Sequence, residues 1–323
     1  MQDGTTVWLP YGREHLSGLP TGLSYGHWDG SPSLPGDPGD VRFLVAPPIM
    51  GSERLLADVL PRMKHLEVLQ LLSSGYDHVR PLLPAMPPGA RLATARGVHG
   101  EATAELAVAL LLAMVRGIDR FVGGQAEGRW RPEVRATLSG KRVLVVGHGA
   151  VGEAVAARLS AFRCEVVPVA RTARPAPGGM VHGTAELPAL LPTVDAVVLC
   201  APLTEQTRGM IDADALALMK DGASLVNVAR GELVDTEALV REVTRGRIRA
   251  ALDVTDPEPL PPGHPLWRSS GVLITPHVAA FTDAFVSRSS DFLRQQLHRY
   301  ARGQNLDNVV LTTAGPGCGE EAA

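Results

Sequence analysis

Short apolar runs, separated by segments of helical or loop character, fill the second half of the chain. Each run is almost continuously hydrophobic, which is typical of parallel strands covered by helices on both faces. Their spacing predicts a doubly wound α/β sheet of about six strands. The runs are RVLVVG at 142–147, EVVPVA at 165–170, AVVLCAP at 196–202, SLVNVA at 224–229, RAALDV at 249–254 and VLITP at 272–276.

The first hundred residues predict a smaller parallel α/β domain. The segment 52–63 lies between two strand candidates and suits a crossover helix, with Ser52 as its N-cap. The strand candidates are TVWLP at 6–10, RFLVAPPI at 42–49, LEVLQLL at 66–72 and RLATA at 91–95, with GLSYGHW at 22–28 a weaker one.

Two further helices are expected. Residues 101–118 are apolar on nearly every side, which predicts a helix buried all round, either between domains or in a subunit interface. Residues 283–303 form one amphipathic pattern. The Gly-rich acidic tail at 314–323 predicts disorder.

Composition narrows the class of protein. The 323 residues are long for a single core, so two domains are expected. The net charge of −3 gives no reason to expect nucleic acid or a membrane surface as partner. Cys164, Cys200 and Cys318 show neither disulfide nor metal-ligand spacing, so we expect a cytoplasmic protein without a metal site. No leader and no bilayer-spanning run is apparent in the sequence.

A glycine pattern follows the first strand of the predicted sheet. Gly147, Gly149 and Gly152 have G-x-G-x-x-G spacing between a strand and an Ala-rich helix. These positions serve a tight turn, close approach of a pyrophosphate, and close helix packing, and the helix N-terminus offers N–H groups to phosphates. The context therefore predicts a Rossmann-type dinucleotide site.

The next strand ends without the acidic residue that usually binds the ribose 2′-hydroxyl of NAD. Arg171 stands there, with Thr172 and Arg174 close by. A guanidinium pairs well with a 2′-phosphate, so NADP is the preferred cofactor. The alternative is that these are solvated loop residues and that the protein takes either NADP or NAD.

Three polar side chains lie at or just beyond the ends of late strands. Arg230 can hold a carboxylate or carbonyl, His277 can exchange a proton near neutral pH, and Glu258 can pair with His277 and favour its protonated form. Taken singly, each is more often a surface charge or a structural residue than a catalytic one. At strand ends behind a dinucleotide loop, the three together predict a catalytic site. Asp253, at the tip of its own strand, could reach the nicotinamide.

Several motifs give a specific resemblance. NVARGELVD, ALDVTDPEPL and LITPHVAAFT follow VVGHGAVG in this order, and LSSGYDHV, GVHGEATAELAVALLLAMVRGI and APLTEQTRGMI extend the match. The chain thus resembles the D-isomer-specific 2-hydroxyacid dehydrogenase family over most of its length. By that resemblance, Arg230, Glu258 and His277 are catalytic, and Ser74 and Gly75 bind the substrate carboxylate together with Arg230.

The resemblance also implies the division of the chain. Residues 1–99 and 283–323 would form a flavodoxin-like substrate domain, and residues 100–282 the Rossmann domain, in a homodimer that uses the long apolar helix. With the motif matches, the expected cofactor contacts are Thr103, Gly147, His148, Gly149, Ala150, Val151, Gly152, Arg171, Thr172, Arg174, Ala201, Pro202, Thr207, Val228, Ala229, Asp253, His277 and Ala280.

Some features set this chain apart within the family. Ala280 stands where members often have Gly, and Thr103 where they have Val, which bears on substrate size and cofactor angle. Side-chain selectivity is expected from loops around Tyr11, Pro48, Ser74 and His99, with His99 a loop residue rather than a catalytic one.

The expected activity is hydride transfer between NAD(P)H and a small 2-oxo acid such as glyoxylate or hydroxypyruvate. Formate-oxidising relatives carry Gln where Glu258 stands, and phosphite-oxidising relatives carry Lys where Ser74 stands. A phosphite-type dehydrogenase and a non-catalytic, dinucleotide-sensing binding protein remain the alternatives.

Overall fold

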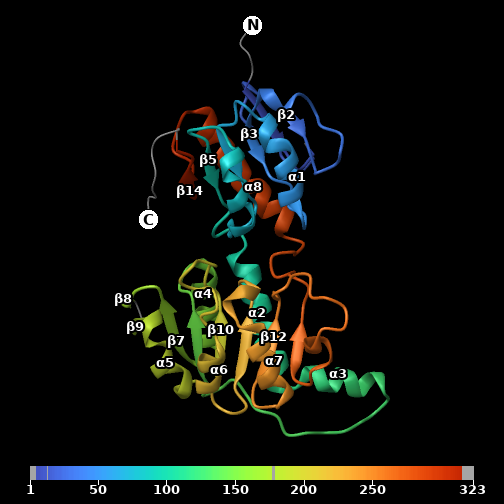
Figure 1. Ribbon diagram of the computed structural model, residues 1–323, viewed down its shortest axis with the longest axis vertical. Coiled ribbons are helices and arrows are strands. Elements are labelled where there is room, and N and C mark those ends of the chain that lie inside the picture. Colours follow the sequence, from blue (N-terminus) through green and yellow to red (C-terminus); the bar gives the residue numbers. More distant parts are fainter. Residues whose placement is uncertain (1–4, 13, 177–178, 315–323) are drawn as a thin grey trace. The chain divides into compact units, whose positions relative to one another are not determined.

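The chain divides into two compact units in a computed structural model that describes residues 5–12, 14–176 and 179–314 (Figure 1). Unit 1 comprises Met1–His99 with Asp283–Ala323, and unit 2 comprises Gly100–Thr282. Both units are α/β, so the predicted fold class is confirmed. Most of the acidic tail, including Cys318, lies outside the described residues, while Cys164 and Cys200 are free thiols.

The sheet of unit 2 has eight described strands, against about six expected. Its strands are parallel except for β8, which pairs antiparallel to β9. In spatial order they are β13 (Val272–Ile274), β12 (Arg249–Leu252), β11 (Ser224–Asn227), β10 (Ala196–Leu199), β6 (Arg142–Val146), β7 (Glu165–Ala170), β9 (Gly179–Gly183) and β8 (Arg174–Ala176). The six apolar runs all form strands, while the short pair β8 and β9 was not predicted because it lacks such a run.

Helices cover both faces of this sheet. One face packs around Val197, Leu225 and Leu239, and the other around Leu111, Val145 and Val226, which is why the strand interiors are apolar on both sides. The helices of the unit are α2 (Gly100–Arg116), α3 (Ile118–Ala126), α4 (Ala150–Ala161), α5 (Leu187–Leu190), α6 (Ala213–Leu218) and α7 (Thr236–Thr244).

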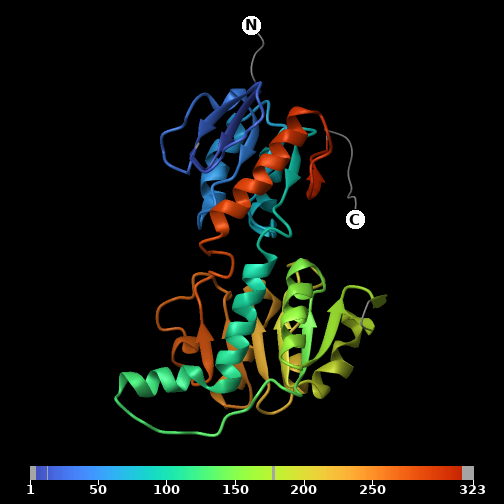
Figure 2. The same cartoon turned by 180° about the vertical axis from the view of Figure 1, so that it is seen from behind.

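Helix α2 crosses one face of the sheet of unit 2, as seen from behind in Figure 2. Leu110, Leu111 and Met114 are buried, whereas Glu105 and Ala109 are exposed. Within the single chain the helix is therefore buried on the face toward the sheet and exposed at Glu105 and Ala109, and its predicted burial in a subunit interface stays a prediction.

Unit 1 contains a six-stranded sheet among its described residues. The order is β14 (Val309–Thr312), β5 (Arg91–Ala93), β4 (Val68–Gln70), β3 (Val41–Val45), β1 (Thr5–Leu9) and β2 (Leu23–His27), with only β14 antiparallel to its neighbour. The sequence did not predict β14, and it placed the ends of β3 and β4 too far along the chain.

The helices of unit 1 pack on its two sheet faces. Helix α1 (Ser52–Val59) joins a core with Trp8, Leu44 and Leu69, and α8 (Phe285–Ala301) lies against the other face (Figure 2). Ser52 was wrongly predicted as the N-cap of α1. The N-cap is Gly51, which has a left-handed φ of 79° and makes no side-chain capping bond.

Helix α1 is also shorter than predicted. It ends at Val59 and is followed by a 3₁₀ turn, η2 (Leu60–Arg62), because Pro61 lacks the N–H that would continue the helix. Two further 3₁₀ segments, η1 (Pro38–Asp40) and η3 (Asp77–Ala85), complete the connections of this unit. Within the described ranges, no helix combines the length and apolar character that a bilayer crossing requires.

Candidate active site

The carboxyl ends of β11, β12 and β13 lie at one edge of the sheet of unit 2. Asn227, Leu252 and Ile274 are in register across these neighbouring parallel strands. Arg230 follows β11 by three residues and His277 follows β13 by three residues. The pairing therefore carries both residues to the edge at which open α/β sheets bind their ligands.

Glu258 and His277 form a direct pair at this edge. Nδ1 of His277 lies 2.6 Å from Oε1 of Glu258, and the two side chains are 36% and 28% exposed. A carboxylate only accepts hydrogen bonds, so Nδ1 carries the proton and donates. This leaves Nε2 as the nitrogen that can exchange a proton with a ligand.

Asp253 shapes the turn that carries His277. Asp253 is 2% exposed, and its carboxylate accepts hydrogen bonds from Thr275 Oγ1 at 2.6 Å, Val278 N at 2.9 Å and Ala279 N at 3.0 Å. Its backbone oxygen accepts from His277 N at 2.8 Å. His277 has a left-handed φ of 52°, which is unusual for a residue with a side chain. These four hydrogen bonds from the turn to Asp253 hold that conformation in place.

A buried asparagine sets the turn before Arg230. Asn227 is 1% exposed; its Nδ2 donates to the Arg230 oxygen at 2.7 Å, and its Oδ1 accepts from Ala229 N at 3.0 Å. Asn227 was not among the predicted site residues, although an amide inside the apolar run SLVNVA was a visible signal. The guanidinium of Arg230 donates to the Ala229 oxygen at 2.7 Å.

Gly231 lets a second chain segment pass close to Arg230. A Cβ at Gly231 would lie 2.1 Å from the carbonyl of Thr255 and 2.5 Å from Asp256 N. Its φ is outside the left-handed region, so close approach, and not backbone freedom, requires glycine here. The segment Thr255–Asp256 leads directly to Glu258, so the Arg230 turn and the Glu258 loop are in close backbone contact.

The glycine loop lies at the point where the strand order reverses, between β6 and β10. Gly147 has φ 105°, and a Cβ there would lie 2.5 Å from Ala201 N, while a Cβ at Gly152 would lie 1.8 Å from the Gly147 oxygen. Both glycines are therefore required by the packing of the protein itself. The reversal of strand order opens the ligand-binding crevice of doubly wound sheets.

Gly149 differs from its two neighbours in the motif. It is the N-cap of α4 with no side-chain capping bond, and no described atom lies within 4 Å of where its Cβ would stand. Nδ1 of the neighbouring His148 is buried and has no hydrogen-bond partner among the described residues. A helix N-terminus with open space and an unpaired polar atom fits a bound pyrophosphate.

The residues expected to bind the 2′ position of the adenosine ribose follow β7. Arg171, Thr172 and Arg174 are exposed, and Nη2 of Arg174 lies 3.4 Å from the His148 oxygen. The Arg174 guanidinium therefore reaches the glycine loop.

Other predicted contact residues lie in the segments that follow β10, β11 and β13, and one lies in helix α2. Oγ1 of Thr207 donates to the Pro202 oxygen at 2.7 Å and accepts from Thr204 N at 2.8 Å, which closes the loop after β10. Ala201 is 7% and Val228 is 8% exposed. Ala280 is half-buried in the turn after His277, and Thr103 is half-buried in the first turn of α2.

The predicted substrate residues Ser74 and Gly75 belong to unit 1. They follow β4, where Oγ of Ser73 donates to the Gly75 oxygen at 2.7 Å and the Ser73 oxygen accepts from Ala95 N at 2.9 Å. Ser74 is exposed, whereas His99 is 5% exposed. Tyr11 and Pro48, expected near the substrate, are half-buried in the same unit.

Comparisons with known proteins place the chain in a family. A family model described as "D-isomer specific 2-hydroxyacid dehydrogenase, NAD binding domain" matches residues 108–279. A glyoxylate reductase from Thermofilum pendens is 34% identical over 262 residues, which are 78% of this chain and 77% of that protein. The chain belongs to the D-isomer specific 2-hydroxyacid dehydrogenase family. It is an oxidoreductase that uses a nicotinamide dinucleotide.

Solved structures of this family have the same fold. A dehydrogenase from Xanthobacter autotrophicus, in complex with NADPH and MES, is 30% identical with a TM-score of 0.78 and covers 95% of this chain and 98% of its own. An NADPH-dependent glyoxylate/hydroxypyruvate reductase from Sinorhizobium meliloti, in complex with NADP and malonate, is 27% identical with a TM-score of 0.77 and covers 95% of this chain and 97% of its own.

Proposed function

We propose that this dehydrogenase reduces a small 2-oxo acid, of the size of glyoxylate or hydroxypyruvate, to its D-2-hydroxy acid with NADPH. The observation that carries the proposal is the Glu258–His277 pair at 2.6 Å, on the sheet edge that also bears Arg230 and the glycine loop. The substrate class is supported by the relatives named glyoxylate and hydroxypyruvate reductases.

Each of the three side chains has one task in the proposed reaction. Arg230 binds the substrate through its carboxylate and carbonyl oxygens, with backbone N–H groups of Ser74 and Gly75 as further donors to the carboxylate. His277 donates the Nε2 proton to the alkoxide oxygen that forms at C2. Glu258 holds the Nδ1–H of His277 and stabilises the imidazolium before the proton leaves. NADPH, held by the glycine loop and α4, would supply the hydride.

Turnover tests this proposal directly. NADPH is mixed with glyoxylate, hydroxypyruvate, pyruvate or phenylpyruvate, and nicotinamide absorbance is followed. We expect His277→Ala to abolish turnover and to leave NADPH binding intact. His182→Ala is the matched control, because His182 pairs with Glu186 at 2.7 Å elsewhere in the unit. A protein that binds NADPH and consumes none with any acid would instead be a dinucleotide sensor.

The preference for NADPH is a further part of the proposal. Arg174 lies beside the glycine loop, and Arg171 stands at the strand end where NAD-binding sites carry an acid. Replacing both by Ser should lower the ratio of kcat/KM for NADPH to that for NADH by about 10- to 100-fold, because charge-assisted bonds to a 2′-phosphate are lost. Arg245→Ser, at the C-terminal end of α7, is the control. An unchanged ratio would remove these arginines from cofactor selection.

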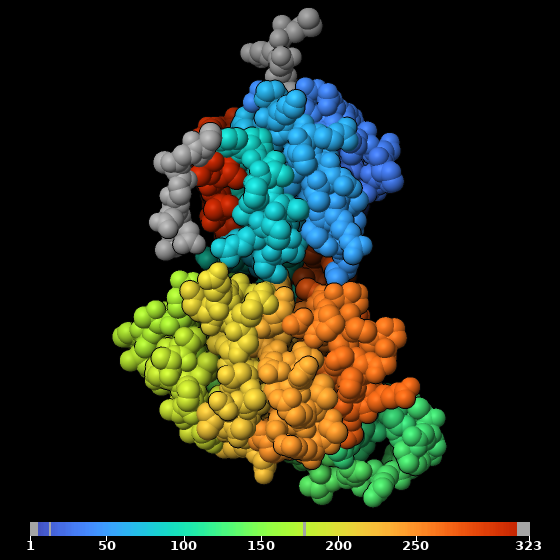
Figure 3. Space-filling view, in the orientation of Figure 1, coloured from blue at the N-terminus to red at the C-terminus, as the bar shows by residue number. Residues whose placement is uncertain are grey.

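We further propose that the protein is a homodimer whose interface includes α3 and the segment up to Val134. Helix α3 has no buried residue among those described. Phe121 and Val122 are 38% and 59% exposed, and Trp130 and Val134 are 98% and 102% exposed. In the space-filling view this segment, coloured green, lies on the surface of unit 2 (Figure 3). Large apolar side chains grouped on one surface are typical of an interface between proteins.

A further inference from the structure

His99 is a buried histidine in unit 1 that contacts the Leu72 carbonyl and the Phe285 ring. It is 5% exposed, its Nε2 lies 3.1 Å from the Leu72 oxygen, and its ring stacks on Phe285 with centroids 4.5 Å apart and planes inclined by 10°. A carbonyl oxygen only accepts, so Nε2 carries a proton and donates to Leu72. Desolvation by burial lowers the pKa of His99 against the opposing effect of the Leu72 carbonyl, and Arg288 lowers it further, which favours the neutral ring.

The partner of this bond is the residue just before the 73–75 loop. Leu72 is 4% exposed and packs with Val45, Val68 and Leu293, so its carbonyl has a fixed position. A second bond runs from Ala95 N to the Ser73 oxygen at 2.9 Å. The segment 95–99 therefore holds the loop at two successive carbonyls, the one at Leu72 through the His99 side chain and the one at Ser73 through the Ala95 backbone N–H.

Phe285 stacks on the imidazole ring of His99 and orients it. It is the first residue of α8, so a residue far along the chain sets the plane of the ring that binds Leu72. A parallel stack at this distance restricts rotation of the ring about its Cβ–Cγ bond, which keeps Nε2 directed at the carbonyl.

We propose that His99 is a positioning residue that holds the 73–75 loop in the shape required to bind the substrate carboxylate, with Phe285 orienting its ring. The inference rests on the proposed function, because that function makes Ser74 and Gly75 carboxylate donors. His99 itself does not touch the substrate. Without its donor, a buried carbonyl is left unpaired and the loop shifts to find a new partner.

The test compares variants that differ in the donor. His99→Leu removes it, His99→Gln offers an N–H near the position of Nε2, and Phe285→Leu removes the stacking face. The matched control is His298→Leu, since Nε2 of His298 lies 3.0 Å from the Gly18 oxygen in the same unit. For each variant we would measure kcat, the KM for the 2-oxo acid, the Kd for NADPH, and hydrogen exchange of a peptide covering residues 72–77.

In His99→Leu we expect the KM for the 2-oxo acid to rise about tenfold, with kcat within a few-fold and the Kd for NADPH unchanged. The 72–77 peptide should exchange about tenfold faster. His99→Gln should restore most of both properties, Phe285→Leu should show a smaller loss, and His298→Leu should resemble the unaltered protein. A KM and an exchange rate unaffected in His99→Leu, or equally altered in His298→Leu, would overturn the inference.

The two proposals fail in different ways. If the unaltered protein reduces no 2-oxo acid, the proposed function fails, and the inference about substrate binding fails with it even when exchange at 72–77 rises. If the unaltered protein turns over and His99→Leu keeps the same KM, only the inference fails. A common fall in stability without rescue by Gln would indicate a purely structural histidine.

Discussion

The glycines near the site have different physical roles, and Gly231 is one that close backbone contact requires. The Thr255 carbonyl occupies the space in which a Cβ would lie, at 2.1 Å. Since both partners are backbone, no side-chain rotation can relieve the contact, and the turn of Arg230 or the loop of Glu258 must move.

Gly231→Ala should therefore lower both stability and activity. Overpacking of this kind costs about 1–3 kcal/mol in the free energy of unfolding. Because either the Arg230 turn or the Glu258 loop is displaced, we expect kcat to fall more than the loss of folded protein explains. Urea unfolding and kinetics at a temperature where the variant is folded would check this. Gly36→Ala is the control, as no atom lies within 4 Å of its Cβ position.

Two glycines of the 147–152 motif are expected to have different roles, Gly152 in packing and Gly149 in the approach of the cofactor. Gly152→Ala should destabilise the fold, because its Cβ would lie 1.8 Å from the Gly147 oxygen. Gly149→Ala meets no described atom within 4 Å, so it should destabilise the fold far less than Gly152→Ala, by no more than the small preference for glycine over alanine at an N-cap. Its methyl group would, however, stand where we propose that the pyrophosphate approaches, and the Kd for NADPH should rise tenfold or more. Equal NADPH affinity in Gly149→Ala and the unaltered protein would contradict the proposed cradle.

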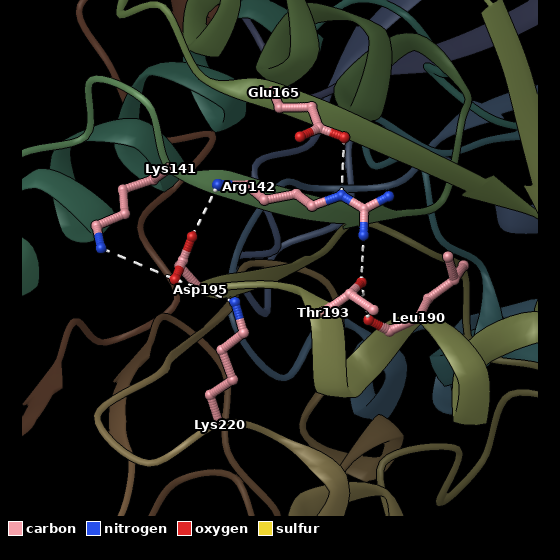
Figure 4. A network of polar contacts seen from close by, with 7 residues as sticks. All are labelled: Lys141, Arg142, Glu165, Leu190, Thr193, Asp195 and Lys220. Atoms are coloured by element: carbon pink, nitrogen blue, oxygen red, sulfur yellow. Dashed lines mark hydrogen bonds and ion pairs between the residues drawn. The ribbon is translucent and has the colours of Figure 1, made fainter.

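At the scale of elements, charged side chains link the amino ends of strands in the sheet of unit 2, opposite the edge that bears the candidate site. Figure 4 shows Asp195 between Lys141, Lys220 and the start of β6. Its carboxylate accepts from Arg142 N at 2.9 Å and lies 3.4 Å from Nζ of Lys220. The Arg142 guanidinium donates to Glu165 at the start of β7 and to Thr193. This network ties together the beginnings of three strands.

The network predicts a dependence of stability on pH. Burial alone raises the pKa of Asp195, but the Arg142 N–H and the two lysines outweigh it, so this pKa lies below its ordinary value. As pH falls, the unfolded chain takes up the proton first. The contribution is therefore complete above the ordinary carboxyl pKa near 4 and disappears as pH falls through the lower folded value.

Asp195→Asn removes this contribution while keeping an acceptor for Arg142 N. We expect it to lower the free energy of unfolding by about 1 kcal/mol at pH 7. The difference from the unaltered protein should shrink as pH falls below 4, which urea unfolding at several pH values would measure. A difference that stays constant with pH would show that the charge of Asp195 does not stabilise the fold.

Elements with a continuous apolar run were predictable, and those defined by distant partners were not. The runs of β6, β10, β11 and β12 are buried on both faces, so their sequence alone indicates that they are strands. Strand β14 pairs with β5, more than two hundred residues away, and is anchored where Gln296 binds both nitrogen and oxygen of Asp307. Nothing local in the sequence encodes that pairing.

The candidate site likewise has features that the sequence predicts and features that only coordinates reveal. The pairing of Glu258 with His277 follows from strand order, because adjacent parallel strands deliver their following loops to one edge. The roles of Asn227 and Asp253 depend on which turn atoms fall within reach of their side chains. Such contacts require coordinates, even though both residues stand out as polar positions within or directly after apolar runs.

At the scale of the whole molecule, the apolar surface of α3 and the following segment bears on assembly. The side chains of Trp130 and Val134 are almost completely exposed in the single chain, which gives them no stabilising contact there. Burying apolar area contributes about 25 cal/mol per Å², so two such residues repeated on two protomers would contribute several kcal/mol to association.

Trp130→Glu combined with Val134→Glu should therefore convert the proposed dimer to monomers, because burying the new carboxylates without partners is unfavourable. Light scattering coupled to size-exclusion chromatography would measure the mass. Trp267→Glu is the matched control, since Trp267 is 51% exposed in the same unit but outside the α3 segment. A variant that keeps the mass of two chains would exclude the 118–134 segment as the interface, and an unaltered protein with the mass of one chain would exclude the dimer itself.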